Sequence, residues 1–178
     1  MSNTSINLKL GKKSYDILIG NNLIEKALFE ELVKNRHVML VYDQNLDSKK
    51  VEDFLSMYSE LGATKSISIG LEASEENKSY ESIQEIQNCL IENQYSRDCL
   101  LIGFGGGIIC DLVGFCASTY QRGVDFALIP TTLLAQVDAS VGGKTAINHI
   151  KGKNMIGSFH QPVKVFIDTN FLSTLPER

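Results

Sequence analysis

The stretch from Gly103 to Gly123 reads G-F-G-G-G-I-I-C-D-L-V-G-F-C-A-S-T-Y-Q-R-G. It follows a short apolar run at 99–102, which is typical of a strand covered on both faces. The residues after the glycines are apolar nearly all round, which predicts a buried helix. Glycines between a strand and a helix let the backbone approach a ligand, and the helix N-terminus favours an anion. The stretch therefore predicts a phosphate-facing turn.

As a dinucleotide fingerprint, G-x-G-x-x-G, this turn is incomplete. The best frame is Gly105, Gly107 and then Cys110, so the third glycine is missing. A glycine-rich turn without a ligand is the alternative interpretation. Asp111 favours a ligand, because a carboxylate in the first turn of a buried helix needs either the helix N-terminus or a polar ligand as its partner.

The length and charge of the chain indicate its general class. Its 178 residues suit a single domain with one sizeable core. A net charge of −4 argues against a nucleic-acid surface and against a polybasic membrane anchor. No apolar run approaches the roughly 18 residues of a membrane span, and the first five residues do not resemble a signal peptide. We therefore expect a cytoplasmic protein.

The cysteines and histidines do not follow a metal-binding pattern. The cysteines at 89, 99, 110 and 116 form no C-x-x-C pair and lie in apolar periodic segments, so we expect buried thiols. His37, His149 and His160 lie far apart and lack the spacing of a zinc signature. We predict no metal site built from this chain.

Hydrophobic periodicity predicts alternating strands and helices. The first twenty residues predict a β-hairpin that turns at 11–13, and 20–22 is expected to end it and cap the next helix. Further strands are expected at 38–41, 67–69, 99–102, 126–129 and 163–167, and helices at 23–33, 51–61, 83–91, 108–117 and 131–141. We predict an α/β fold over residues 1–178, Rossmann-like, with a mostly parallel, doubly wound sheet and an N-terminal hairpin.

Two segments near the C-terminus have their own signals. A threonine at 131 or 132 is expected to cap the last helix, with Leu133, Leu134 and Val137 as its apolar positions. Residues 142–161 contain several glycines and little periodicity, so they predict a loop or a small hairpin.

Polar residues follow several of the predicted strands, and in a doubly wound fold they should share one rim. In chain order they are Asp43 and Asn45, Glu75 and Lys78, the glycine turn with Asp111, and Thr131 and Thr132. Asp43 is interpreted either as a solvated loop acid or as a carboxylate near an adenosine ribose, which would favour NAD over NADP. Glu75 and Lys78 by themselves are typical of a solvated surface pair.

The segment 139–167 contains four lysines and two histidines but no carboxylate. Its local positive potential predicts an anionic ligand. Residues 141–145, V-G-G-K-T, imitate the end of a P-loop, but the first glycine of that motif is replaced by Asp138, so we reject it. Asp138 and Lys144 are interpreted as a paired acid and base of a site, or as a structural ion pair.

Three longer motifs resemble a known family. They are GGGIICDLVGF at 105–115, YQRGVDFALIPTTLLAQVDASVGGKTAINH at 120–149, and GKNMIGSFHQP at 152–162. These motifs strongly resemble the 3-dehydroquinate synthases, near-continuously from about residue 100 to residue 178 and more sparsely before. The chain also resembles, more weakly, the sugar-phosphate cyclases and the metal-dependent glycerol and alcohol dehydrogenases.

The resemblance implies an NAD-binding domain of a phosphorus–oxygen lyase of the shikimate pathway. That enzyme converts 3-deoxy-arabino-heptulosonate 7-phosphate to 3-dehydroquinate and phosphate, toward chorismate and the aromatic amino acids. The implied NAD contacts are Asp43, Asn45, Glu75, Lys78, Gly106, Gly107, Ile108, Asp111, Thr131, Thr132, Leu134, Lys144, Lys153, Phe171, Thr174 and Leu175. The implied contacts to the anionic sugar phosphate are Arg122, Asp138, Lys144 and Asn154. The whole enzyme is expected to be a homodimer without nucleic-acid or membrane partners.

Two departures from the family qualify what the resemblance implies. Cys110 stands where the family usually has glycine, which would be harmful only if the position required a positive φ. The family's helical C-terminal domain, with the glutamate and two histidines that hold zinc or cobalt, is expected beyond Arg178. We therefore expect no synthase activity from these 178 residues alone. The alternatives are a non-catalytic NAD-binding module and the N-terminal domain of a related metal-dependent polyol dehydrogenase.

Overall fold

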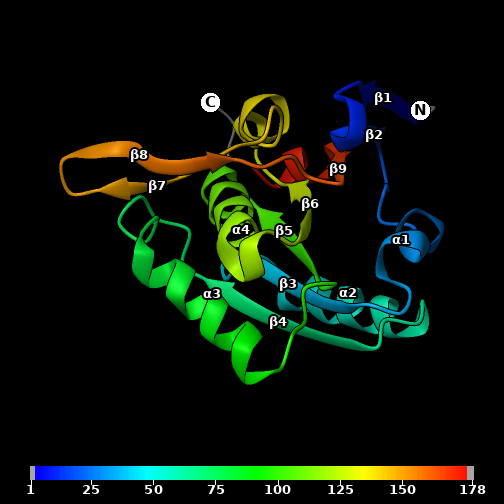
Figure 1. The fold of residues 1–178 in the computed structure, drawn as a ribbon. Coiled ribbons are helices and arrows are strands. Elements are labelled where there is room, and N and C mark those ends of the chain that lie inside the picture. The colour runs from blue at the N-terminus through cyan, green and yellow to red at the C-terminus, as the bar shows by residue number, and fades with distance from the viewer. Residues whose placement is uncertain (1–2, 176–178) are drawn as a thin grey trace.

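A seven-stranded sheet forms the centre of the protein in the computed structural model, which describes residues 3–175. Its strands are β1 (Thr4–Leu8), β2 (Tyr15–Gly20), β3 (His37–Asp43), β4 (Lys65–Leu71), β5 (Leu100–Gly105), β6 (Asp125–Pro130) and β9 (Lys164–Asp168). They lie in the order β1-β2-β9-β6-β5-β3-β4, and every neighbouring pair is parallel except β1 with β2 (Figure 1). The predicted parallel sheet and N-terminal hairpin are confirmed.

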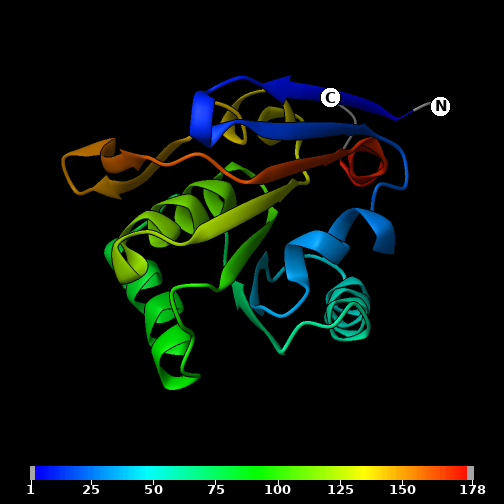
Figure 2. The ribbon, with the colours of Figure 1, turned by 45° about the vertical axis from the view of Figure 1, so that its right-hand side comes forward.

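Helices cover both faces of this sheet (Figures 1 and 2). One face carries α1 (Lys26–Val33) and α2 (Ser48–Glu60), and the other carries α3 (Tyr80–Glu92) and α4 (Gly107–Thr119). Alternate residues of β3 point to opposite faces, so Val38 and Leu40 join the core under α1 and α2 while Met39 and Val41 join the core under α3 and α4. The two cores explain why the strands read as continuous apolar runs.

Short helical turns complete the chain. They are η1 (Gly11–Lys13), η2 (Tyr120–Arg122) and η4 (Thr169–Thr174), which are 3₁₀ turns, and η3 (Ala135–Ala139), which is a π-helical turn. Within the described part of the chain, none of the helices is both long and apolar enough to cross a membrane.

A second, two-stranded sheet lies against α4. It is the antiparallel hairpin of β7 (Lys144–His149) and β8 (Gly152–Phe159), so the small hairpin predicted at 142–161 is confirmed. The hairpin extends beyond the main sheet at the left of Figure 1 and packs along the side of α4. This third layer explains why α4 is apolar nearly all round, because β5, α3 and the hairpin cover different sides of it.

Two glycines set how closely the hairpin approaches α4. A Cβ added to Gly114 would lie 2.3 Å from Thr145 Cγ2, and one added to Gly157 would lie 2.1 Å from the carbonyl oxygen of Thr145. The Thr145 hydroxyl also contacts the Ser158 hydroxyl at 2.9 Å and the Ser158 carbonyl oxygen at 3.1 Å. Thr145 is therefore packed between α4 and β8 without room for another methyl group.

The segment after β6 differs from its prediction. Thr132 does cap it, because its hydroxyl accepts a hydrogen bond from the N–H of Ala135 at 3.3 Å. However, the turn that follows is a π-helix, in which Ser140 N–H donates to the carbonyl of Ala135 at 3.0 Å. The wider turn changes which residues share a face, so Ala135 and Gln136 are buried. The predicted apolar positions Leu133, Leu134 and Val137 are exposed, and that prediction is wrong.

The predicted cap of the first helix is also wrong. Helix α1 begins at Lys26, several residues after the 20–22 segment, and Glu25 at its N-cap makes no side-chain cap hydrogen bond. Asn22 instead adopts a φ of 56°, and its N–H donates to the buried carboxylate of Asp168 at 3.3 Å. The 20–22 segment thus joins β2 to the end of β9, a contact that depends on sheet order.

The packing of Thr145 against Gly114 predicts the effect of one added methyl group. We expect Gly114→Ala to lower the free energy of unfolding by about 1–3 kcal/mol in urea titrations, because overpacking outweighs the gain in helix propensity. Thr145→Ser removes the opposing methyl group and keeps the hydroxyl. The double variant Gly114→Ala/Thr145→Ser should therefore regain most of the loss. A Gly114→Ala chain as stable as the parent would contradict this packing.

Candidate functional site

The carboxyl ends of the parallel strands meet at one edge of the sheet, and the glycine turn lies in the middle of this edge. A Cβ added to Gly105 would lie 3.3 Å from the Cβ of Asp43, and one added to Gly106 would lie 3.3 Å from Thr132 Cγ2. Thr131 N–H donates to the carbonyl of Gly105 at 2.9 Å. The expectation that Asp43, the glycine turn and the two threonines share one rim is confirmed.

The glycine turn leaves the start of α4 open. Gly106, at the N-cap, makes no side-chain cap hydrogen bond, and residues 106–108 are only partly buried. Next to it, Asp43 Oδ1 accepts hydrogen bonds from the backbone N–H and the side-chain amide of Asn45, both at 3.0 Å. Helix-terminal N–H groups beside backbone without side chains form a surface that suits a phosphate group.

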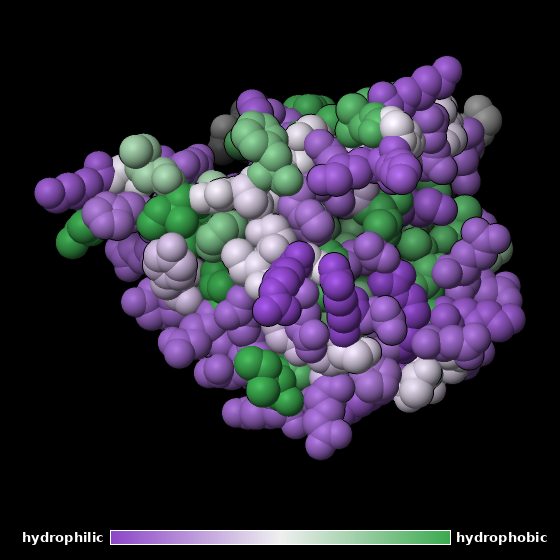
Figure 3. All heavy atoms as spheres, in the orientation of Figure 1, coloured by the Kyte–Doolittle hydropathy of each residue, from purple (hydrophilic) through white to green (hydrophobic). Residues whose placement is uncertain are grey.

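A cavity of about 490 Å³ lies beside this rim, between α4, the end of η3 and the β7–β8 hairpin. Its wall includes Asp111, Asp138, Lys144 and Asn154. Three of the four residues predicted to contact a sugar phosphate therefore line one cavity. The face in Figure 3 carries apolar side chains over the hairpin and η3 among mostly hydrophilic surroundings. Exposed apolar side chains of this region include Val137 of η3, at 68%, and Phe159 of β8, at 78%.

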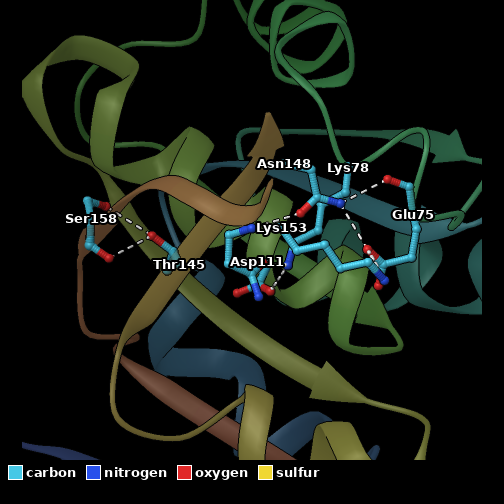
Figure 4. Close-up of polar contacts among 8 residues, drawn as sticks. Glu75, Lys78, Asp111, Thr145, Asn148, Lys153 and Ser158 are labelled. Carbon is cyan, nitrogen blue, oxygen red and sulfur yellow. Dashed lines mark hydrogen bonds and ion pairs between the residues drawn. The ribbon is translucent and has the colours of Figure 1, made fainter. Parts of the chain in front are cut away.

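Asp111 of the cavity wall belongs to a buried ion pair. Lys78 Nζ lies 2.5 Å from Asp111 Oδ2 and also donates to Asn154 Oδ1 (Figure 4). The side chains of Lys78 and Asp111 are only 6% and 17% exposed. Burial raises the pKa of Asp111 above its ordinary value, while the ammonium of Lys78 opposes that rise. The partner of Asp111 is thus Lys78 of the same chain, whereas the sequence predicts the helix N-terminus or a polar ligand.

The interpretation of Glu75 and Lys78 as a solvated surface pair is wrong. Glu75 is exposed and pairs with Lys153 at 3.4 Å, whereas Lys78 is buried beneath the hairpin. The hydrogen bond from Asn148 lowers the pKa of Glu75 most; burial opposes this shift, and the charge of Lys153 adds to it. The loop after β4 is therefore attached to the hairpin by several contacts, which Figure 4 shows.

The predicted pairing of Asp138 with Lys144 is not formed. Both side chains are exposed at the cavity, and among residues 3–175 no ion pair joins them. Lys144 begins strand β7 instead of lying in a loop. The carboxylate of Asp138 and the ammonium of Lys144 are therefore both free to contact a ligand in the cavity.

Other predicted site residues lie farther from the cavity. Arg122 is in η2, which follows the far end of α4 and precedes the start of β6, and it has a φ of 67°. Phe171 is buried against Phe104 with ring centroids 5.3 Å apart, and Lys50 lies over its ring at 4.8 Å. Leu175 N–H donates to the Leu172 carbonyl at 3.2 Å, and the side chain of Thr174 lies outside the described part of the structure.

Cys110, at the position where the resemblance implies a glycine, fits its surroundings. It lies inside α4, almost fully buried, and is not among the residues with positive φ. Burial raises the pKa of its thiol to about 12, so it stays protonated. All four cysteines are free thiols, and only Cys89 is less than fully buried. The prediction of buried thiols is confirmed for the other three.

Sequence reasoning missed Asn148, Thr145 and Ser158. Thr145 and Ser158 line the cavity, and Asn148 connects the hairpin to the loop after β4. The only local signal for these residues is that they are polar residues in the segment 142–161, which the sequence predicts to be a loop or a small hairpin. Among residues 3–175, no three His, Cys, Asp or Glu side chains come close enough to hold a metal ion.

Known proteins resemble this chain in sequence. The family model "3-dehydroquinate synthase N-terminal" matches residues 68–178. The chain is 46% identical to the 3-dehydroquinate synthase of Vibrio atlanticus over 174 residues, which is 97% of this chain and 48% of the relative. It is 44% identical to that of Coxiella burnetii, covering all of this chain and 49% of the relative. The chain thus spans about half the length of the curated relatives it matches.

Solved structures share the fold. A 2-deoxy-scyllo-inosose synthase complexed with carbaglucose-6-phosphate, NAD⁺ and Co²⁺ superposes with a TM-score of 0.86 at 23% identity, over 98% of this chain and 48% of that one. The 2-epi-5-epi-valiolone synthase of Streptomyces hygroscopicus, with NAD⁺ and Zn²⁺ bound, has a TM-score of 0.81 at 29% identity, over 94% and 46%. A glycerol dehydrogenase from Schizosaccharomyces pombe is more distant, with a TM-score of 0.62 at 21% identity over 85% and 36%.

The buried ion pair predicts how Lys78→Met would behave. This substitution leaves the Asp111 carboxylate without its cation. We therefore expect the free energy of unfolding, measured in urea at pH 7, to fall by about 3 kcal/mol. The pKa of Asp111 should rise further, as ¹³C NMR of its carboxyl would report. Because a raised folded-state pKa favours the protonated folded form, the loss should shrink as the pH falls toward the ordinary aspartate pKa.

The double variant Lys78→Met/Asp111→Leu supplies the control. It replaces both charges with apolar groups, so it should recover most of the lost stability. Equal stability of the Lys78→Met chain and the parent would show that the pair contributes nothing.

Proposed function

Because the chain belongs to the 3-dehydroquinate synthase family, we propose that it forms the NAD-binding part of a 3-dehydroquinate synthase. The whole protein would convert 3-deoxy-arabino-heptulosonate 7-phosphate to 3-dehydroquinate and phosphate. The observation that carries this proposal is the glycine turn at the strand ends, which lies directly beside the cavity of Asp138, Lys144 and Asn154. Such a reaction needs a site for the dinucleotide next to a charged cavity for the sugar phosphate.

The rim fits NAD at several positions. The turn at 105–107 has no side chains, so a pyrophosphate could approach the N–H groups at the start of α4. Asp43 is fixed by Asn45 at the end of β3, where a carboxylate accepts hydrogen bonds from a ribose and repels a 2′-phosphate. We assign Thr131, Thr132, Ile108 and Asp111 to the same cofactor, with Leu134, Lys153, Phe171, Thr174 and Leu175 as further proposed contacts.

The cavity fits a small anionic polyol. Lys78 and Asp111 neutralise each other, so the exposed ammonium of Lys144 remains to attract a phosphorylated sugar. Asp138 is exposed at the same wall, where it can accept a hydrogen bond from a substrate hydroxyl, and Asn154 can donate its side-chain amide. Bound NAD would supply reversible hydride transfer at one ring carbon. Arg122 remains a proposed substrate contact, although it does not line this cavity.

A divalent metal does not fit the described residues. No group of three metal-ligating side chains forms among residues 3–175, so we derive no step through zinc or cobalt. If catalysis by the whole enzyme requires the metal, these 178 residues bind ligands without completing the reaction. The homodimer expected of the whole enzyme also stays a prediction.

Titration calorimetry tests the cofactor assignment. We expect the parent chain to bind NAD more tightly than NADP, because the Asp43 carboxylate repels the 2′-phosphate. Asp43→Asn keeps an acceptor for Asn45 but removes the charge, so the preference for NAD should narrow by roughly fivefold or more. Asp47→Asn, a charge removal at the start of α2, is the control and should leave the preference unchanged. An Asp43→Asn chain with the parent's preference would contradict the ribose assignment.

A phosphate-release assay tests the second part of the proposal. The isolated chain, supplied with NAD, zinc and the heptulosonate phosphate, should release no phosphate above the rate without protein. Steady release would show that these residues suffice for the chemistry. Accumulation of NADH from glycerol-like polyols would instead favour a polyol dehydrogenase.

A further inference from the structure

Asn148 lies near the end of β7, at a break in the register of the hairpin. Ile147 pairs with Ile156 but His149 pairs with Gly152, so three residues of β8 lie opposite Asn148. Such irregularities redirect the backbone and side chain of a strand residue. Here the N–H of Asn148 donates to the backbone carbonyl of Lys78 at 2.7 Å, outside the hairpin.

The side-chain amide of Asn148 connects the loop after β4 to strand β8, one through its nitrogen and the other through its oxygen. Its nitrogen donates to the backbone carbonyl of Glu75 at 3.0 Å and to Glu75 Oε2 at 2.9 Å. Its oxygen accepts from the N–H of Asn154 at 2.9 Å. Asn154 makes this hydrogen bond in a left-handed backbone conformation, with a φ of 56°, which asparagine tolerates. Figure 4 shows Asn148 among Glu75, Lys78 and Lys153.

These contacts close a ring of three residues. Asn148 donates to the carbonyl of Lys78, Lys78 Nζ donates to the side chain of Asn154, and Asn154 N–H donates back to Asn148. Lys78 also holds Asp111 on α4. A shift of any one member therefore displaces the other two, and with them the charged wall of the cavity.

We propose that Asn148 is a positioning residue that holds the loop of Glu75 and Lys78 at a fixed place relative to Asn154 in the cavity. The inference rests on the proposed function in one respect. Glu75 and Lys78 are proposed cofactor contacts, and Asn154 is a proposed substrate contact. Asn148 would then link the cofactor side of the site to its substrate side without touching either ligand.

The chemistry of the amide explains why asparagine suits this position. It donates to a carboxylate and accepts from a backbone N–H at the same time, which neither aspartate nor alanine can do. The hydrogen bond from Asn148 is also the largest influence that lowers the pKa of Glu75. The side chain of Asn148 therefore connects the loop to the hairpin, because it bonds Glu75 of the loop and Asn154 of the hairpin at the same time.

Two substitutions separate the two ends of the amide. Asn148→Ala removes both side-chain contacts, whereas Asn148→Asp keeps an acceptor for Asn154 N–H but loses the donor to Glu75. Asn93→Ala is the matched control, because it removes a side-chain amide bonded locally to the Cys89 carbonyl at 2.9 Å in α3. Amide exchange and carboxyl titrations by NMR would follow Asn154 and Glu75 in the chain without ligand, and NAD would then be added.

We expect the amide of Asn154 to exchange about five- to tenfold faster in Asn148→Ala, as the loss of one ordinary hydrogen bond predicts. Asn148→Asp should keep the parental exchange rate at Asn154. The pKa of Glu75 should rise in both variants, and Asn93→Ala should change neither quantity. In the parent, NAD should shift the Asn154 resonance, and this shift should shrink in Asn148→Ala.

Parental exchange at Asn154 in Asn148→Ala, or an unchanged pKa of Glu75, would overturn the positioning role. An NAD-induced shift at Asn154 that persists in Asn148→Ala would overturn the link between the two sides. A parent chain that does not respond to NAD would contradict the proposed function alone, because exchange and titration are measured without ligand. If Asn148→Ala does not fold, Asn148→Asp provides the test. A raised pKa of Glu75 with parental amide exchange at Asn154 supports the positioning role, and an unchanged pKa of Glu75 overturns it.

Discussion

The buried ion pair of Lys78 and Asp111 connects three parts of the chain that are far apart in the sequence. Asp111 belongs to α4, Lys78 to the loop after β4, and Asn154, which also contacts Lys78, to the hairpin. Because neither charge can be buried alone without a large cost, the three parts must come together for the fold to be stable. Asp111 and Asn154, which Lys78 holds together, both line the cavity between α4 and the hairpin.

Glycine has two different tasks in this architecture. At 105–107 it keeps side chains away from the strand ends, where a ligand needs access to backbone N–H groups. At Gly114 and Gly157 it lets Thr145 pack tightly, with no ligand involved. Both tasks occur within or against one helix, so the same element presents an open N-terminus to the rim and a closely packed side to the hairpin. The proposed cofactor rim and the proposed substrate cavity are neighbours for this reason.

The distribution of charge follows from that arrangement. The lysine-rich segment folds as the hairpin and its flanks. It meets Glu75 of the loop after β4 through Lys153, and Asp111 of α4 through the backbone of Ala146. Two of its lysines differ accordingly: Lys153 pairs with Glu75, whereas Lys144 faces the cavity beside Asp138 without an ion pair among the described residues. A site that keeps one cation and one acid unneutralised suits a ligand carrying both an anionic group and hydroxyls.

Much of the fold followed from local pattern, because strand and helix periods and a glycine turn are properties of neighbouring residues. The sheet type, the N-terminal hairpin and the rim of Asp43, the glycines and Thr132 were predictable in this way. Tertiary structure alone decided the burial of Lys78, the π-turn that exposes Leu134, the place of Arg122 beyond α4 and the ring around Asn148. Each depends on partners more than 25 residues away or on a backbone irregularity, which hydrophobic periodicity does not encode.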